Sequence, residues 1–101
     1  MAKPIIWTET ASNDLERAVD YIYLDSPSYA LSFLSDVMER VKTLDVFPYR
    51  GRLVPEVNDD HVREIFIHRY RLIYQVEEDQ IVILTLVHGA MNWNGQIIPH
   101  I

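Results

Sequence analysis

Arg71 is the side chain with the clearest capacity for chemistry, because it lies within an otherwise strand-like stretch, Tyr70–Val76. The stretch alternates as a β-strand does, which places Arg71 on the same face as Ile73 and Gln75. A guanidinium beside an isoleucine on a central strand is expected either to be paired with an acidic group or to have a functional role. Two interpretations stay open: an ion pair with Glu64 on the neighbouring strand, or the floor of a polar site.

Arginine collects in one part of the chain, which allows a local basic site on an acidic body. Residues 46–76 contain five arginines and four acids, whereas residues 8–45 contain eight acids and three bases. Arg50 and Arg52 lie in a predicted loop, where a guanidinium can tie loop carbonyls to the sheet or contact a partner. Both roles stay open for this pair.

His68 and His88 fall at a predicted turn and at the end of a predicted strand, which are ordinary positions for histidine. No histidine has the helical spacing to another ligand that a zinc site needs. The three glycines, at positions 51, 89 and 95, form no phosphate-binding loop. We therefore expect neither a metal nor a cofactor.

The composition indicates one domain spanning residues 1–101. The net charge of −6 argues against direct nucleic-acid binding, because such affinity rests on Lys and Arg that neutralise phosphates. The absence of cysteine fits an intracellular, reducing compartment. No apolar run approaches the roughly 20 residues that a membrane span requires, so no membrane association is expected.

The elements that position these side chains begin with a short edge strand, Ile5–Trp7. Thr8 is a suitable N-cap for a first helix, whose apolar face is formed by Ala11, Leu15, Ala18, Val19 and Ile22. Ser26 and Pro27 then break the chain and restart it as a second amphipathic helix, which we expect to end at Phe47–Pro48. Such a short link predicts an antiparallel helical hairpin.

Three strands are predicted after a loop over residues 49–60, namely 62–67, 70–76 and 81–87. They form an antiparallel meander that the N-terminal strand completes as one sheet, with the helical hairpin on one face. The predicted fold class is therefore a two-layer α+β domain, whose uncovered sheet face is the natural place for a site. The tail, residues 90–101, shows no periodicity, and Trp93 within it either packs over the sheet or anchors a partner.

The order of these elements resembles the RelE/ParE superfamily of toxins from bacterial type II toxin–antitoxin systems. The resemblance covers residues 5–89 and is carried by Pro48–Arg52, Val62–Ile65, Tyr70–Tyr74 and Val87–Gly89. The Pro-x-x-Gly-Arg segment and the Arg-Glu pair before the Tyr-Arg-x-Ile-Tyr strand look more like the ParE (plasmid stabilisation) branch. This resemblance implies a small cytoplasmic toxin that a co-expressed antitoxin neutralises.

The two branches imply different activities. A ParE-like toxin acts by binding, with DNA gyrase as the implied target, and has no enzymatic activity of its own. A RelE-like toxin is a ribosome-dependent mRNA endoribonuclease, which here would use Arg71, Arg63, His68 and His88. The expected companions of Arg71 are replaced by Glu64 and Met91, so we favour the ParE-like function and lean towards a protein that is not an enzyme. A degenerate member that only binds antitoxin is the third alternative.

The antitoxin is the partner that the resemblance implies, with DNA gyrase as a second. Antitoxin segments of this family add a strand to an open sheet edge and lay a helix in an apolar groove. We therefore expect this chain alone to keep both an open edge and a groove. The predicted partner-binding residues are Arg50, Arg52, Arg63, Arg71, Tyr74 and Trp93.

Overall fold

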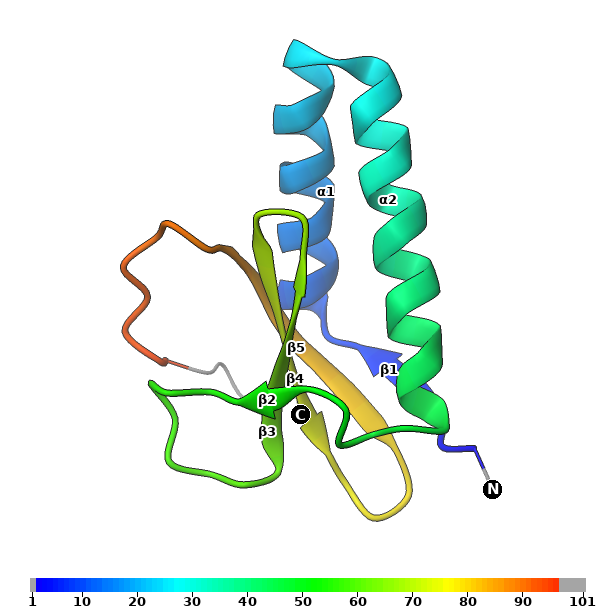
Figure 1. Ribbon diagram of the computed structural model, residues 1–101, viewed down its shortest axis with the longest axis vertical. Coiled ribbons are helices and arrows are strands. Elements are labelled where there is room, and N and C mark those ends of the chain that lie inside the picture. Colours follow the sequence, from blue (N-terminus) through cyan, green and yellow to red (C-terminus); the bar gives the residue numbers. More distant parts are fainter. Residues whose placement is uncertain (1, 97–101) are drawn as a thin grey trace.

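A helical hairpin packs on one face of a five-stranded sheet (Figure 1). The structure is a computed structural model that describes residues 2–96. Its elements are β1 (Ile5–Trp7), α1 (Glu9–Asp25), α2 (Pro27–Lys42), a 3₁₀ turn (Thr43–Asp45), β2 (Arg52–Leu53), β3 (Val62–Ile67), β4 (Tyr70–Val76) and β5 (Ile81–His88). The expected two-layer α+β architecture is confirmed.

Both helices begin at the residues that the sequence marks as caps. The hydroxyl of Thr8 accepts a hydrogen bond from the backbone N–H of Ala11 at 3.0 Å, and Ser26 ends α1 and caps α2. Pro27 takes the first position of α2, where a missing N–H costs nothing. The predicted end of α2 was wrong: the helix stops at Lys42 and tightens into the 3₁₀ turn.

The Thr8 cap also joins α1 to the sheet, because its hydroxyl donates to the carbonyl of Ile83 at 2.9 Å. We expect Thr8→Ala to lower the free energy of unfolding by about 1 kcal/mol. Urea denaturation measures this change. Thr8→Ser, which keeps the hydroxyl, is the matched control, and an equal loss in both variants would contradict a capping role.

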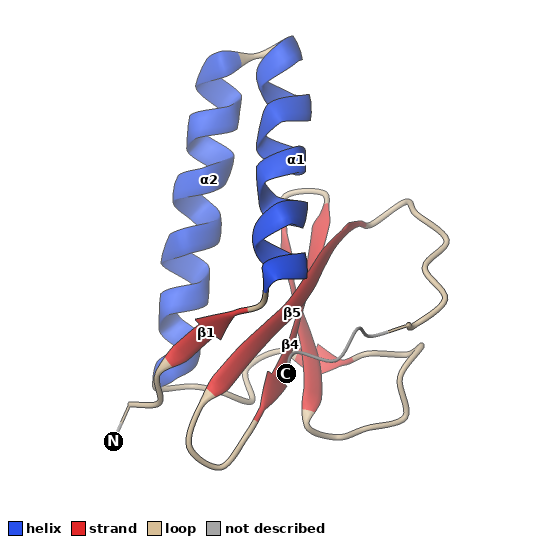
Figure 2. Ribbon diagram, turned by 180° about the vertical axis from the view of Figure 1, so that it is seen from behind, coloured by secondary structure: helices blue, strands red, loops and turns tan. Residues whose placement is uncertain are grey.

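The sheet order is β1-β5-β4-β3-β2. β3, β4 and β5 form the expected antiparallel meander, and β1 joins it at one edge by pairing in parallel with residues 81–83 of β5 (Figure 2). The two-residue strand β2 was not predicted and forms the other edge by pairing with β3. Both edge strands are short, which limits uncontrolled pairing with other chains.

The alternation of β4 divides its side chains between two apolar clusters. Leu72, Tyr74 and Val76 point to the helices and join the main core, which also contains Phe33 and Leu44. Ile73 points to the other face and joins a smaller cluster, completed by Val54, Val62, Val82, Leu84 and Val87. The helix-free face is therefore partly covered by the loop after β2 and by the segment after β5.

Candidate functional site

Arg71 lies on the helix-free face, where two carboxylates hold it in a buried ion-pair network. Its Nε donates to Glu64 Oε1 at 2.7 Å, and its two terminal nitrogens donate to the two oxygens of Glu56 at 2.8 and 2.7 Å. Glu64 is 1% exposed and Arg71 is 6% exposed. The sequence left two roles open for Arg71, and its contacts are those of the ion pair.

Two arginine–aromatic contacts and a second ion pair extend this network. Arg52 Nε pairs with the other oxygen of Glu64 at 2.5 Å, and its guanidinium lies 4.8 Å from the centre of the Phe66 ring. Trp93 covers Arg71, with 5.5 Å between the guanidinium carbon and the ring centre. Trp93 therefore packs over the sheet, as one of its two predicted roles required.

The network sets the charge state of its members. The hydrogen bonds from Arg71 hold the pKa of Glu56 below its ordinary value of 4.5, against an opposing effect of desolvation. The same bonds raise the pKa of Arg71 above its ordinary value. Both groups are therefore charged throughout the physiological pH range. Both terminal nitrogens of Arg71 already donate hydrogen bonds to Glu56.

Because the pKa of Glu56 is lower in the folded state, its ion pair stabilises the fold above about pH 4.5. This stabilisation is lost as the pH falls through the folded-state value. We expect the stability difference between the wild type and Glu56→Gln to be constant from pH 7 to about pH 5, and to shrink below it. Urea denaturation from pH 7 to pH 3 measures it, and a difference that is constant down to pH 3 would contradict the ion pair.

The loop between the 3₁₀ turn and β3 is fixed by three of the predicted site residues. The buried hydroxyl of Tyr74 donates to the carbonyl of Pro48 at 2.8 Å and accepts from the backbone N–H of Gly51 at 3.0 Å. Arg63 donates to the carbonyl of Gly51 at 3.2 Å, and Arg50 donates to the Thr43 hydroxyl. These contacts are structural; a partner contact by the same residues stays a prediction.

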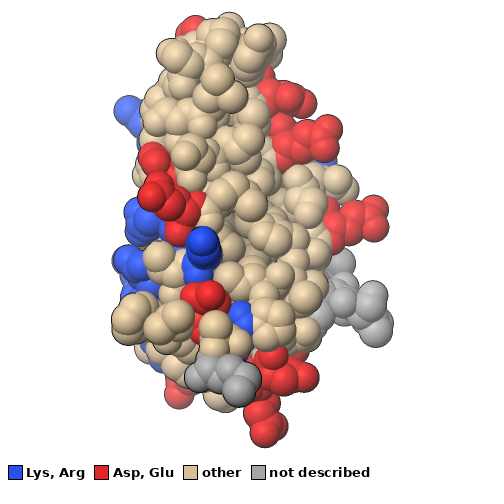
Figure 3. Space-filling model, turned by 90° about the vertical axis from the view of Figure 1, so that its right-hand side faces the viewer, with Lys and Arg blue, Asp and Glu red and all other residues tan. Residues whose placement is uncertain are grey.

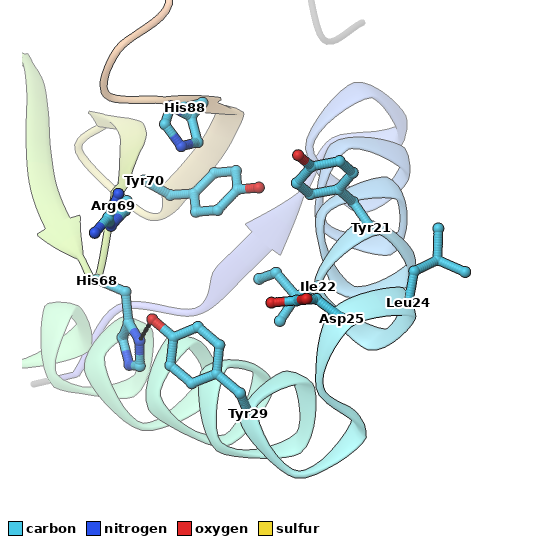
Figure 4. A pocket seen from close by; sticks show the side chains of 9 residues that line it. All are labelled: Tyr21, Ile22, Leu24, Asp25, Tyr29, His68, Arg69, Tyr70 and His88. Atoms are coloured by element: carbon cyan, nitrogen blue, oxygen red, sulfur yellow. Dashed lines mark hydrogen bonds between the residues drawn. The ribbon is translucent and has the colours of Figure 1, made fainter.

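His68 and His88 lie on the helix side of the sheet and line one cavity of about 590 Å³ (Figure 4). His68 Nδ1 bonds the Tyr29 hydroxyl at 2.8 Å, and Nε2 bonds Asp36 at 2.6 Å. Its φ of 55° is the left-handed conformation that closes the β3–β4 turn. Sequence spacing gave no sign that the two histidines line one cavity, since β3, β4 and β5 place them around it only in the fold.

The four residues of the nuclease hypothesis are therefore divided between two faces. Arg71 lies on the helix-free face with both Glu56 and Glu64, and Arg63 is tied to loop carbonyls. The histidines are on the other face, where His68 contacts α2 and His88 packs on Tyr70. These four residues therefore do not bring a base and an unpaired cation together at one point.

An apolar groove of about 520 Å³ lies between the two helices, beside β1. Its lining residues are Trp7, Ser12, Leu15, Glu16, Val19, Asp20, Leu34 and Met38. Figure 3, viewed from the side on which α2 lies, shows a largely uncharged strip of surface with acidic residues along one margin and both basic and acidic residues along the other. The expected groove is thus present, and β2 leaves one edge of the sheet without a further strand among residues 2–96.

Within residues 2–96, no three histidine, cysteine or acidic side chains gather as a metal site would require. Neither helix of this described region is long and apolar enough to span a bilayer. Residues 90–96 of the tail form no helix or strand. The rest of the tail, including Ile97 and Ile98, lies outside the described residues.

Comparison with known proteins agrees with this geometry. Residues 5–93 match the family model described as the ParE toxin of the type II toxin–antitoxin system parDE. No curated protein sequence matches the chain significantly. A structure of the chromosomal ParDE toxin–antitoxin system from P. aeruginosa is similar, with a TM-score of 0.70 and 27% identity over 86% of this chain and 96% of that one.

The fold is also similar to a chain in the RelBE2 toxin–antitoxin complex from Mycobacterium tuberculosis. The TM-score there is 0.61, with 22% identity over 87% of this chain and 99% of that one. This second likeness concerns the fold alone, whereas the family match extends over most of the sequence. The chain belongs to the ParE toxin family of type II toxin–antitoxin systems.

Proposed function

We propose that this chain is a cytoplasmic toxin that acts by binding its target, DNA gyrase, and that a cognate antitoxin neutralises it. The observation that carries the proposal is the state of Arg71. Glu56 and Glu64 neutralise its guanidinium within a buried network, so it has little capacity to stabilise the charge of a phosphodiester transition state.

The surface of the helical hairpin supports the antitoxin part of the proposal. The groove beside α1 and α2 is apolar, and it has the form that an amphipathic helix requires. Exposed Leu53 on β2 marks the sheet edge that a further strand would extend. An antitoxin segment that folds on binding would bury both surfaces at once.

The experiment combines induced expression in bacterial cells with a gyrase assay on the purified chain. We expect filamentation and a DNA-damage response in cells, and inhibition of supercoiling in vitro. Co-expression of the protein encoded beside the toxin gene should abolish both effects. Cleaved messenger RNA with normal supercoiling would favour the nuclease and overturn the gyrase assignment. Normal growth with intact antitoxin binding would identify a member that has lost toxicity.

A further inference from the structure

The helical hairpin extends past the sheet, so the sheet-facing side of its tip has no strand beneath it (Figure 1). The resulting cavity opens between the end of α1, the start of α2, the β3–β4 turn and the end of β5. It is separate from the Arg71 network, and it does not share a lining residue with the interhelical groove. The proposed function leaves this cavity unused.

Three tyrosine rings, from Tyr21, Tyr29 and Tyr70, line the cavity. Figure 4 shows them arranged around it, with the carboxylate of Asp25 directed into the space between them. Tyr21 is 72% exposed and Tyr29 45% exposed, so their rings are accessible to a ligand. Aromatic faces beside a carboxylate are the surroundings that a cationic group prefers.

Asp25 has a position that helix stability does not explain. It is in the last turn of α1, where the helix dipole disfavours negative charge, and that turn contains no basic residue. The carboxylate of Asp25 makes no ion pair or hydrogen bond with another residue in the range 2–96. An unpartnered carboxylate beside three tyrosines is thus available to an incoming cation.

The basic groups that line the cavity do not outweigh its preference for a cation. Among its described lining residues, Arg69 is the one permanent cation, and Figure 4 shows it on the side of Tyr70 away from Tyr21. His68 is already engaged by Tyr29 and Asp36. His88 accepts a hydrogen bond from the N–H of Ala90 through Nδ1, so that nitrogen already has a partner. The acidic hairpin, with seven acids against three bases over residues 9–42, further favours a cation.

We propose that this cavity binds a lysine or arginine side chain of the antitoxin. The inference rests on the proposed function, because it assumes that an antitoxin binds this chain. The cationic head would contact the Asp25 carboxylate, and its stem would lie against the rings of Tyr21, Tyr29 and Tyr70. The cavity thereby selects a partner with a basic residue next to its helix-binding segment.

The first experiment tests the cavity without an antitoxin. Tyrosine ring signals of the isotopically labelled chain are followed by NMR during addition of N-acetyl-arginine-N-methylamide, its neutral citrulline analogue or inorganic phosphate. We expect only the arginine compound to shift the signals of the three cavity tyrosines, and Asp25→Asn to weaken its binding about tenfold. Equal shifts with citrulline, no shifts, or a response to phosphate alone would overturn the inference.

The second experiment uses the antitoxin complex and separates the two proposals. Asp25→Asn and the matched control Glu39→Gln each remove one hairpin charge, and exposed Glu39 does not line the cavity. We expect the first change alone to weaken antitoxin binding about tenfold, with thermal stability unchanged or raised. Replacing the critical antitoxin Lys or Arg by Gln should remove that difference. Wild-type affinity in Asp25→Asn would reject the cavity, whereas no binding to the wild type would reject the proposed function.

Discussion

Glu64→Ala is expected to lower the free energy of unfolding by about 3 kcal/mol, which corresponds to a fall of about 12–24 °C in Tm. Glu64 is fully buried at the side chain and bonds both Arg71 and Arg52. Its removal leaves the guanidinium of Arg71 buried with one carboxylate, Glu56, instead of two. The cost arises because Arg71 Nε loses its acceptor at a buried position and the network keeps two positive charges against one negative charge. An intact buried pair, by contrast, contributes little net stability.

Two further variants test this explanation by thermal and urea denaturation. Arg52→Ala removes the partner whose side chain is 60% exposed, so we expect a loss of at most about 1 kcal/mol. The double variant Glu64→Met/Arg71→Met replaces the two buried charges by apolar groups and should recover most of the loss, because the charges that remain, on Glu56 and Arg52, belong to side chains that reach solvent. If the double variant were less stable than Glu64→Ala, packing rather than the unpaired charge would be responsible.

Tyr74→Phe is expected to lower the free energy of unfolding by about 2 kcal/mol without changing the packing of the ring. The change removes one hydroxyl but leaves two backbone groups, the N–H of Gly51 and the carbonyl of Pro48, without that partner. Tyr23→Phe is the matched control, because Tyr23 is 55% exposed. We expect a change within about 0.5 kcal/mol there.

Hydrogen exchange locates the effect of Tyr74→Phe. The amide of Gly51 should exchange faster, and amides in the paired strands β4 and β5 should lose protection only as global stability falls. Gly51 can be replaced by no larger residue here, because an added Cβ would lie 2.6 Å from both the carbonyl oxygen of Glu64 and the hydroxyl of Tyr74. Unchanged protection at Gly51 would show that another contact holds the loop.

The sequence predicted the elements that have strong local signals. The alternation of apolar and polar residues predicted β3 and β4 with the bounds that are observed. The starts of the two helices were indicated by Thr8, Ser26 and Pro27. The pairing of Arg71 with Glu64 was one of the two interpretations that the sequence left open, because adjacent strands bring such residues within reach. The family resemblance depended on the same strands and is confirmed by the match over residues 5–93.

The missed features arise from tertiary contacts that leave no local pattern. β2 contains two residues and exists because it pairs with β3. Glu56 lies in a loop of mixed composition, and nothing in its spacing indicates that it binds Arg71. The cavity that contains His68 and His88 likewise depends on the length by which the hairpin exceeds the sheet.

The parallel pairing of β1 with β5 has a consequence for synthesis of the toxin. Ile5 pairs with Ile81, so the first strand has no partner in the sheet until the chain has been synthesised as far as β5. At typical elongation rates that interval is about 4–15 s. The nascent chain therefore remains without its complete sheet for that interval, and a product that terminates before β5 lacks the strand with which β1 pairs.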